Sequence, residues 1–185
     1  MSVMTGGEVL TMSLAQEGVE VIFGLPGVQV LGILDALYRN KGIRWVTVRH
    51  EQTAAFMAYG YARTTGKVGV AVVVPGPGAL NATAALGTAY AASTPVLLIS
   101  GQIESYNLGQ KRNVLHEIDD QLEVFRPITK WCHRVLSMKS VINGLLGAKH
   151  QKVYVSPPSM LCSPPFGYLG LEAHSPGQLT LILAR

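Results

Sequence analysis

Residues 68–74 read Val-Gly-Val-Ala-Val-Val-Val, and residues 75–78 read Pro-Gly-Pro-Gly. A continuous apolar run rich in β-branched side chains is typical of a strand that is buried on both faces, as in a parallel sheet. The prolines and glycines that follow predict a tight turn. Residues 79–92 then have the pattern of a helix built mostly from very small side chains. Together the strand, the turn and the helix indicate one unit of an α/β domain.

Similar units lie on both sides of this stretch. A capping box at Thr5 and Glu8 predicts a first helix that ends near Gly18. The other expected elements are strands at 19–23, 43–48, 95–100, 129–135 and 153–156 and helices at 30–39, 51–65 and 117–125. Their alternation predicts an α/β domain with three layers, α/β/α, and a mostly parallel sheet of about six strands.

Composition restricts the class of protein. With 48% apolar and 14% charged residues, the 185-residue chain is not disordered, and we expect a domain at residues 1–161 followed by an irregular tail at 162–185. The net charge of +4 comes from scattered residues, so neither a nucleic-acid surface nor a membrane surface is expected. Prolines and glycines divide the apolar region 68–100 into pieces too short to cross a bilayer. The start of the chain does not resemble a signal peptide, and we expect a cytoplasmic protein.

Candidate functional residues follow the expected parallel strands, at the edge where ligands bind in open α/β sheets. Pro26 and Gly27 follow the first strand, Glu51 the second, and Pro77 and Asn81 the third. Glu51 is the one acid in this set, so the edge is polar but nearly uncharged. Such an edge suits a neutral heteroaromatic ring better than a phosphate group. The five histidines have no i, i+4 spacing, so no metal site is expected.

Each of these residues also has an ordinary explanation. The proline–glycine pairs are typical of turns, and Glu51 could simply complement the dipole at the start of a helix. No glycine-rich phosphate loop is present, which argues against a doubly wound nucleotide-binding protein. Only the joint occurrence of the five residues at one sheet edge favours a functional site.

The residues at this edge belong to motifs that occur together in one known family. They are Gly24-Leu-Pro-Gly27, Arg49-His-Glu-Gln52 with the helix up to Arg63, Thr65-Gly66, Gly76-Pro-Gly78 with Asn81, Pro95-Val-Leu-Leu-Ile-Ser-Gly-Gln102 and Phe125-Arg-Pro-Ile-Thr-Lys130. The set resembles the N-terminal, pyrimidine-binding domain of thiamine-diphosphate-dependent enzymes, of the acetolactate synthase, pyruvate oxidase and oxalyl-CoA decarboxylase type. The resemblance covers roughly residues 4–135 and is specific when the motifs are taken together.

The resemblance implies a role for each candidate. In that family the glutamate that matches Glu51 is catalytic: it hydrogen-bonds N1′ of the aminopyrimidine and favours the imino tautomer, whose exocyclic nitrogen takes the C2 proton of the thiazolium. Pro26 and Gly27 would line the pyrimidine pocket, and Pro77 and Asn81 would lie near it. The expected function is the pyrimidine-binding domain of a 2-keto-acid decarboxylase or carboligase.

Two departures from the family pattern limit this expectation. The chain has three aspartates, none beside a glycine, and so lacks the Gly-Asp-Gly motif that grips the diphosphate through Mg²⁺. We therefore expect the pyrimidine half of the site alone, present as a fragment or a separate subunit, with Mg²⁺ bound only when a partner domain is present. The domain would be inactive by itself, and its partner would be another chain or a second copy in a dimer or tetramer. In addition, Leu115 and His116 replace the Phe-Gln of acetolactate synthases, which puts that chemistry in doubt. The alternative is a non-catalytic assembly module, or a truncated remnant that has kept the fold.

Overall fold

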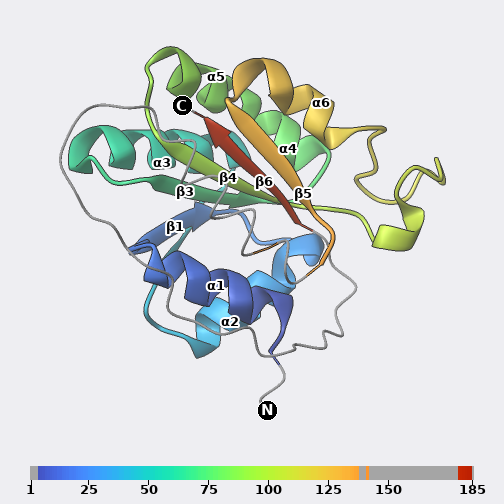
Figure 1. Ribbon diagram of the computed structural model, residues 1–185, viewed down its shortest axis with the longest axis horizontal. Coiled ribbons are helices and arrows are strands. Elements are labelled where there is room, and N and C mark those ends of the chain that lie inside the picture. Colours follow the sequence, from blue (N-terminus) through green and yellow to red (C-terminus); the bar gives the residue numbers. More distant parts are fainter. Residues whose placement is uncertain (1–3, 138–140, 142–178, 185) are drawn as a thin grey trace.

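A three-layer arrangement is visible in the computed structural model, which describes residues 4–137, 141 and 179–184 (Figure 1). One sheet lies in the middle, with α1 and α2 on one face and α3 and α5 on the other. The helices are α1 (Gly6–Gln16), α2 (Leu31–Arg39), α3 (Glu51–Thr65), α4 (Pro77–Asn81), α5 (Thr83–Ala91) and α6 (Gln121–Phe125), with 3₁₀ turns at Val28–Val30, Ser105–Asn107 and Arg126–Ile128.

The sheet has the strand order β2-β1-β3-β4-β6-β5. Its strands are β1 (Val21–Gly24), β2 (Arg44–Thr47), β3 (Gly69–Val73), β4 (Val96–Gly101), β5 (Trp131–Val135) and β6 (Leu179–Ala184). The first four strands are parallel, which confirms the predicted α/β class and its parallel sheet. Because they are parallel, the residues that follow β1, β2, β3 and β4 all lie at the same edge of the sheet.

Apolar residues fill the spaces on both sides of the sheet. β3 and β4 are fully buried, as the valine-rich sequence predicts. On the α1 and α2 side the core is made of larger aliphatic residues such as Leu10 and Ile33. On the α3 and α5 side it is made largely of alanines, together with Phe125, which is completely buried. The small side chains allow α3 and α5 to pack close to the sheet.

The first helix begins as the sequence predicts. The side chain of Thr5 accepts a hydrogen bond from the backbone N–H of Glu8, and Glu8 Oε2 accepts one from the backbone N–H of Thr5 at 2.7 Å, so the capping box is confirmed. This backbone hydrogen bond lowers the pKa of the Glu8 carboxyl. None of the helices in residues 4–137, 141 and 179–184 is long and apolar enough to span a membrane.

The small-residue helix differs from the prediction. Instead of one helix over residues 79–92, the chain forms α4 and α5, which meet at Ala82. The helix begins earlier because proline suits the first turn of a helix, where no N–H is needed. It is interrupted because the N–H of Ala82 bonds to the carbonyl of Ala79, three residues back, and the Thr83 hydroxyl donates to the carbonyl of Leu80. These two bonds tighten the chain and separate the two helices.

The C-terminal end also differs from the prediction. Residues 179–184 form β6, which pairs antiparallel with β4 and with β5, whereas the sequence analysis expected residues 162–185 to be irregular. The expectation is wrong for this segment. Its sequence, Leu-Thr-Leu-Ile-Leu-Ala, has no clear periodicity and so gives no local signal for a strand. The segment becomes a strand because it pairs with the edge of β4. The strand expected at 153–156 and the domain boundary at residue 161 lie outside the described residues.

The contact between α3 and β3 generates a first prediction. A Cβ added at Gly69 would lie 2.5 Å from the carbonyl carbon of Ala58, so we expect Gly69→Ala to lower the free energy of unfolding by about 1–3 kcal/mol. The matched control is Gly60→Ala on α3, the helix that contains Ala58, where the added carbon has open space. That change should raise stability by about 0.5–1 kcal/mol, because alanine favours the helical backbone. Urea unfolding measures both, and equal stability of the two variants would contradict the described packing of α3 on β3.

Candidate functional site

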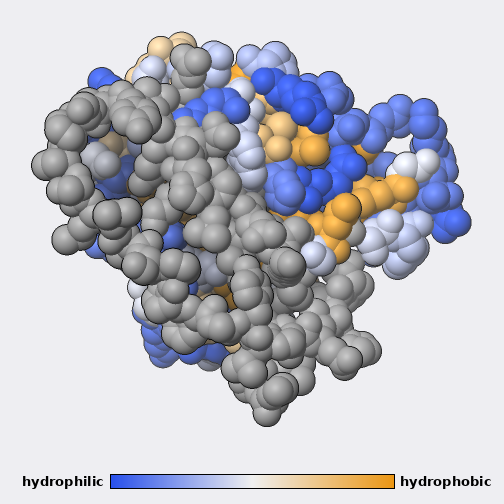
Figure 2. Space-filling model, viewed as in Figure 1, coloured by the Kyte–Doolittle hydropathy of each residue, from blue (hydrophilic) through white to orange (hydrophobic). Residues whose placement is uncertain are grey.

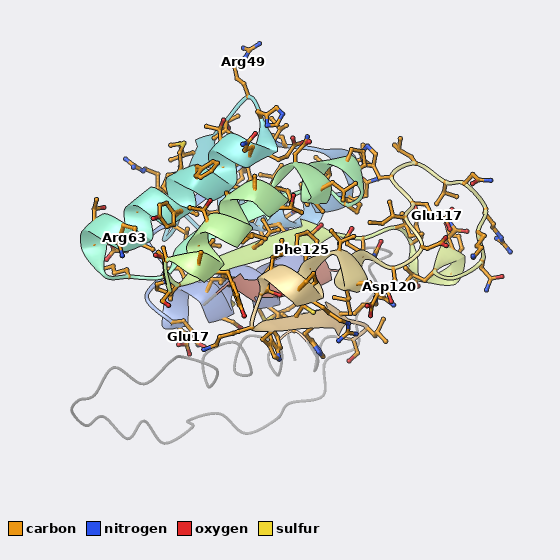
Figure 3. The ribbon with its side chains drawn as sticks, turned by 90° about the horizontal axis from the view of Figure 1, so that it is seen from above. Glu17, Arg49, Arg63, Glu117, Asp120 and Phe125 are labelled. Atoms are coloured by element: carbon orange, nitrogen blue, oxygen red, sulfur yellow. The ribbon has the colours of Figure 1, made fainter. Side chains whose placement is uncertain are left out.

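Glu51 is a buried acid at the start of α3. Its residue is 8% exposed, and His50 caps the helix by accepting a hydrogen bond from the N–H of Gln52 on Nδ1 at 3.2 Å. By contrast, Arg49, two residues before Glu51, projects away from the domain (Figure 3). The start of a helix favours a negative charge, which partly offsets the loss of water around the carboxylate. The carboxylate of Glu51 is therefore turned into the protein at the carboxyl edge of the parallel strands.

Asn81 and Gly78 lie beside the two oxygens of this carboxylate. Asn81, the last residue of α4, donates a hydrogen bond from Nδ2 to Glu51 Oε2 at 3.0 Å. Gly78 lies on the other side, since a Cβ built on it would be 3.2 Å from Oε1. No other side chain in the described part of the chain donates a hydrogen bond to Glu51. Oε1 thus lies beside bare backbone, where a flat ligand could approach.

Val74 joins the turns that follow β1 and β3. A Cβ added at Gly27 would overlap Val74 Cγ1, and one added at Gly78 would lie 2.6 Å from Val74 Cγ2. The valine side chain is thus packed between these two glycines. Both turns need glycine for this close approach, and through Gly78 the contact reaches Glu51.

The structure therefore unites most of the residues that the sequence singled out. Glu51 and Asn81 are hydrogen-bonded, and Gly27 belongs to the same group through its contact with Val74 and Gly78. Pro26 and Pro77 are exposed beside these glycines at the same edge. Their role towards a ligand, like that of the other three, stays a prediction.

The sequence analysis did not identify Gln121, a buried polar residue at this edge. Gln121 is 1% exposed and begins α6. Its side-chain oxygen accepts a hydrogen bond from the N–H of Gly76 at 3.2 Å, and its nitrogen donates to Ser100 Oγ at 3.0 Å and to the carbonyl of Gly101 at 3.3 Å. A single glutamine in a weakly patterned segment gives no sequence signal for such a role, because nothing in the pattern shows that it is buried.

The Leu115-His116 pair, which departs from the family pattern, lies beside the turn between β3 and α4 that contains Gly76. A Cβ on Gly76 would be 2.5 Å from the carbonyl oxygen of His116, and His116 has a left-handed backbone with φ of 68°. Leu115 is 66% exposed. On the face drawn in Figure 2, hydrophilic residues cover α6 and the outer loop, and apolar residues show between them. The departure from the family pattern therefore concerns the candidate site and not a remote surface.

The described residues offer no obvious metal ligands. In residues 4–137, 141 and 179–184, no three His, Cys, Asp or Glu side chains gather closely enough to hold a metal ion. The chemistry at the edge thus consists of one carboxylate, one amide that hydrogen-bonds to it, and two proline–glycine turns in which the prolines are exposed.

The fold and the residues at this edge agree with the protein family that the sequence matches. The chain belongs to the thiamine pyrophosphate enzymes, because the model of their N-terminal TPP binding domain matches it over residues 4–124. Membership confirms the resemblance seen in the sequence. It also implies that thiamine diphosphate is the cofactor of the family to which the domain belongs.

Relatives with curated descriptions support the same assignment. The chain is 46% identical over 134 residues to a probable 2-ketoarginine decarboxylase of Pseudomonas aeruginosa, a match that covers 72% of this chain and 24% of that protein. It is 47% identical over 130 residues to the acetolactate synthase large subunit of Haemophilus influenzae, which covers 70% of this chain and 22% of that protein. The chain thus spans about a quarter of the length of these relatives. It corresponds to the N-terminal cofactor-binding domain of acetolactate-synthase-like enzymes.

The hydrogen bond between Asn81 and Glu51 generates a second prediction. Asn81→Asp keeps the shape of the side chain but replaces a donor by a second carboxylate beside Glu51. At pH 7 we expect a loss of about 1–3 kcal/mol in the free energy of unfolding, since an attractive contact becomes a repulsive one. Asn40→Asp is the matched control, because the Asn40 oxygen accepts a hydrogen bond from Gly42 and an aspartate oxygen can do the same. If both variants unfold at the same urea concentration, the described contact with Glu51 is wrong.

Proposed function

We propose that this domain holds the aminopyrimidine ring of thiamine diphosphate in an enzyme that decarboxylates or joins 2-keto acids. The observation that carries the proposal is the buried Glu51 carboxylate, with one oxygen bonded to Asn81 and the other beside Gly78. When bound, thiamine diphosphate supplies the electron sink for cleavage of the bond next to a keto group.

Glu51 is the group that holds and shares a proton. A carboxylate that is shielded from water and fixed in position can hydrogen-bond a ring nitrogen such as N1′ and exchange a proton with it. Asn81 keeps Oε2 engaged and fixes the plane of the carboxylate, which leaves Oε1 for the ring nitrogen. Because Arg49 projects away into solvent, it does not compete for this acid (Figure 3).

The glycine turns fit a flat, uncharged ring. Gly27 and Gly78 carry no side chain where they pack against Val74, so a flat ring next to Glu51 would meet backbone at Gly78 and not a side chain. Pro26 and Pro77 are exposed next to them and would form the rigid edge of the pocket. This donor set suits the pyrimidine and not the diphosphate, in agreement with the expectation from the sequence.

We propose that the diphosphate and Mg²⁺ are held by another domain. The relatives are about four times as long as the matched segment, and that length leaves room for such a domain in the same chain or in a partner. Oligomeric assembly would then complete the site, as a dimer or a tetramer. Decarboxylation of a 2-keto acid agrees with the name of the Pseudomonas relative. A cytoplasmic location also stays a prediction.

A non-catalytic assembly module is the second candidate. The inner side of α5 packs within the domain through Ala85, Leu86 and Ala89. Its outer side includes small residues, since a Cβ at Gly87 would meet no atom within 4 Å and Ala84 is exposed. Because these side chains are small, α5 could pack close to a helix of another chain whether or not the domain serves catalysis.

The role of Glu51 is tested by Glu51→Gln in a protein that joins this domain to a diphosphate-binding domain. We expect turnover to fall by about 10²–10⁴-fold, because glutamine cannot exchange the proton. Circular dichroism should show an intact fold, since the amide has nearly the shape of the carboxyl group. Glu17→Gln is the control, at an exposed position at the end of α1, and it should leave turnover unchanged. Turnover by the Glu51 variant equal to that of the wild type would refute the proposal.

Cofactor binding by the chain alone is a separate test. We expect titration of the 185-residue chain with thiamine diphosphate and Mg²⁺ to give little or no heat in a calorimeter, because the diphosphate lacks its ligands. Adding a diphosphate-binding domain should restore the heat of binding. Tight binding by the chain alone would contradict the division of the site between two domains.

A further inference from the structure

We propose that Gln121 is a positioning residue of the candidate site, which holds the turn after β3 so that Gly78 and Val74 stay in place against Glu51. The inference deepens the proposed function and rests on it for the role of Glu51. The contacts that carry the inference are those of Gln121 itself, and they do not depend on the cofactor.

Gln121 uses both ends of its side-chain amide inside the protein. Its oxygen accepts a hydrogen bond from the N–H of Gly76 at 3.2 Å, in the turn between β3 and α4. Its nitrogen donates to Ser100 Oγ at 3.0 Å and to the carbonyl of Gly101 at 3.3 Å, both at the end of β4. Gln121 therefore ties the turn to the neighbouring strand, although it lies 45 residues further along the chain than Gly76.

Ser100 extends the same connection to the other end of the turn. Its hydroxyl oxygen lies 3.4 Å from the carbonyl oxygen of Val74 and 3.0 Å from that of Gly101. The hydroxyl has one proton, which it donates to one of these carbonyls at a time while it accepts from Gln121. Through Gly76 directly and through Ser100 indirectly, Gln121 restrains both ends of the segment Val74–Gly76.

This segment needs a restraint because its backbone conformation is unusual. Gly76 has φ of 57° and ψ of −118°, a combination that side chains with a Cβ avoid, and the carbonyl of His116 covers its Cα. The residues on either side of the turn form the site: Val74 fits between the two glycines, and Gly78 lies against Oε1 of Glu51. A small displacement of the turn would therefore change the surroundings of that oxygen.

The ordinary alternative is that Gln121 only satisfies buried backbone groups and so stabilises the fold. The two roles differ in what a substitution does to Glu51. A purely stabilising residue changes the free energy of unfolding and leaves the Glu51 carboxyl as it was. A positioning residue also changes the environment of that carboxyl, which Gln121 itself does not contact among the described interactions.

The experiment follows two NMR signals in the 185-residue chain without any cofactor: hydrogen exchange at the Gly76 amide and the side-chain carboxyl ¹³C shift of Glu51. For Gln121→Leu we expect exchange at Gly76 to become about tenfold faster, because this N–H loses its partner, and the Glu51 signal to move. Ser100→Ala removes the hydroxyl that links Gln121 to Val74 but leaves the hydrogen bonds of Gln121 to Gly76 and Gly101, so it should move the Glu51 signal less and leave exchange at Gly76 nearly unchanged.

Gln102→Leu is the matched control. Gln102 is also a buried glutamine at the end of β4, 5% exposed, but its oxygen accepts from its own neighbour, the N–H of Ile103, at 2.8 Å. This variant should leave both signals in place. If Gln121→Leu fails to fold, Gln121→Glu replaces it, because a glutamate oxygen still accepts from Gly76 while the amide that donates to Ser100 and to the Gly101 carbonyl is lost. For that variant we expect protected exchange at Gly76 and a displaced Glu51 signal.

The outcome separates this inference from the proposed function. An unmoved Glu51 signal in a folded Gln121 variant would overturn the positioning role, whatever the domain binds. A displaced signal combined with undiminished turnover of Glu51→Gln would leave the positioning role intact and refute the function proposed for Glu51. In the joined two-domain protein, Gln121→Leu should also weaken thiamine diphosphate binding, and binding as tight as in the wild type would count against the inference.

Discussion

The side chain of Val74 lies between Gly27 and Gly78, and the arrangement of the whole edge depends on this contact. Each glycine allows the valine to approach closer than any residue with a Cβ would. The turn after β1 and the turn after β3 are thereby pressed together, and Gly78 is brought against Glu51. A close-packed interior does not deform gradually, so this contact can hold the position of a group several residues away.

Glu51 is the group that this packing places, and the magnitudes suggest that it is there for function. Removing a carboxylate from water costs several kcal/mol. One hydrogen bond from Asn81 returns about 1.5–3 kcal/mol, and the start of α3 adds roughly 0.3–2 kcal/mol. An apolar residue would fit this position at lower cost. Positions where a protein breaks such a local rule are often functional ones, which agrees with the family of thiamine pyrophosphate enzymes to which the chain belongs.

The sequence predicts a structural feature well when neighbouring residues produce it, and poorly when the residues that produce it lie far apart in the chain. The capping box of α1 and the buried valine strand β3 were predictable because neighbouring residues produce them. The division of the small-residue helix at Ala82 was missed, because it depends on a hydrogen bond from Thr83 that competes with the regular helical pattern. β6 was missed because its partner strand β4 lies far away in sequence. Gln121 was missed for the same reason, since its partners Gly76 and Ser100 are also distant.

The sequence alone determined the α/β class, the parallel strands and the residues that meet at their carboxyl edge, because period, turn residues and strand direction are written in short stretches. It also contained the motifs that identify the family. Only the tertiary structure decided which oxygen of Glu51 is bonded, which glycines touch Val74 and which buried glutamine ties the turn to the next strand. These are distances between segments far apart in the chain, and they are fixed by packing, which no local pattern encodes.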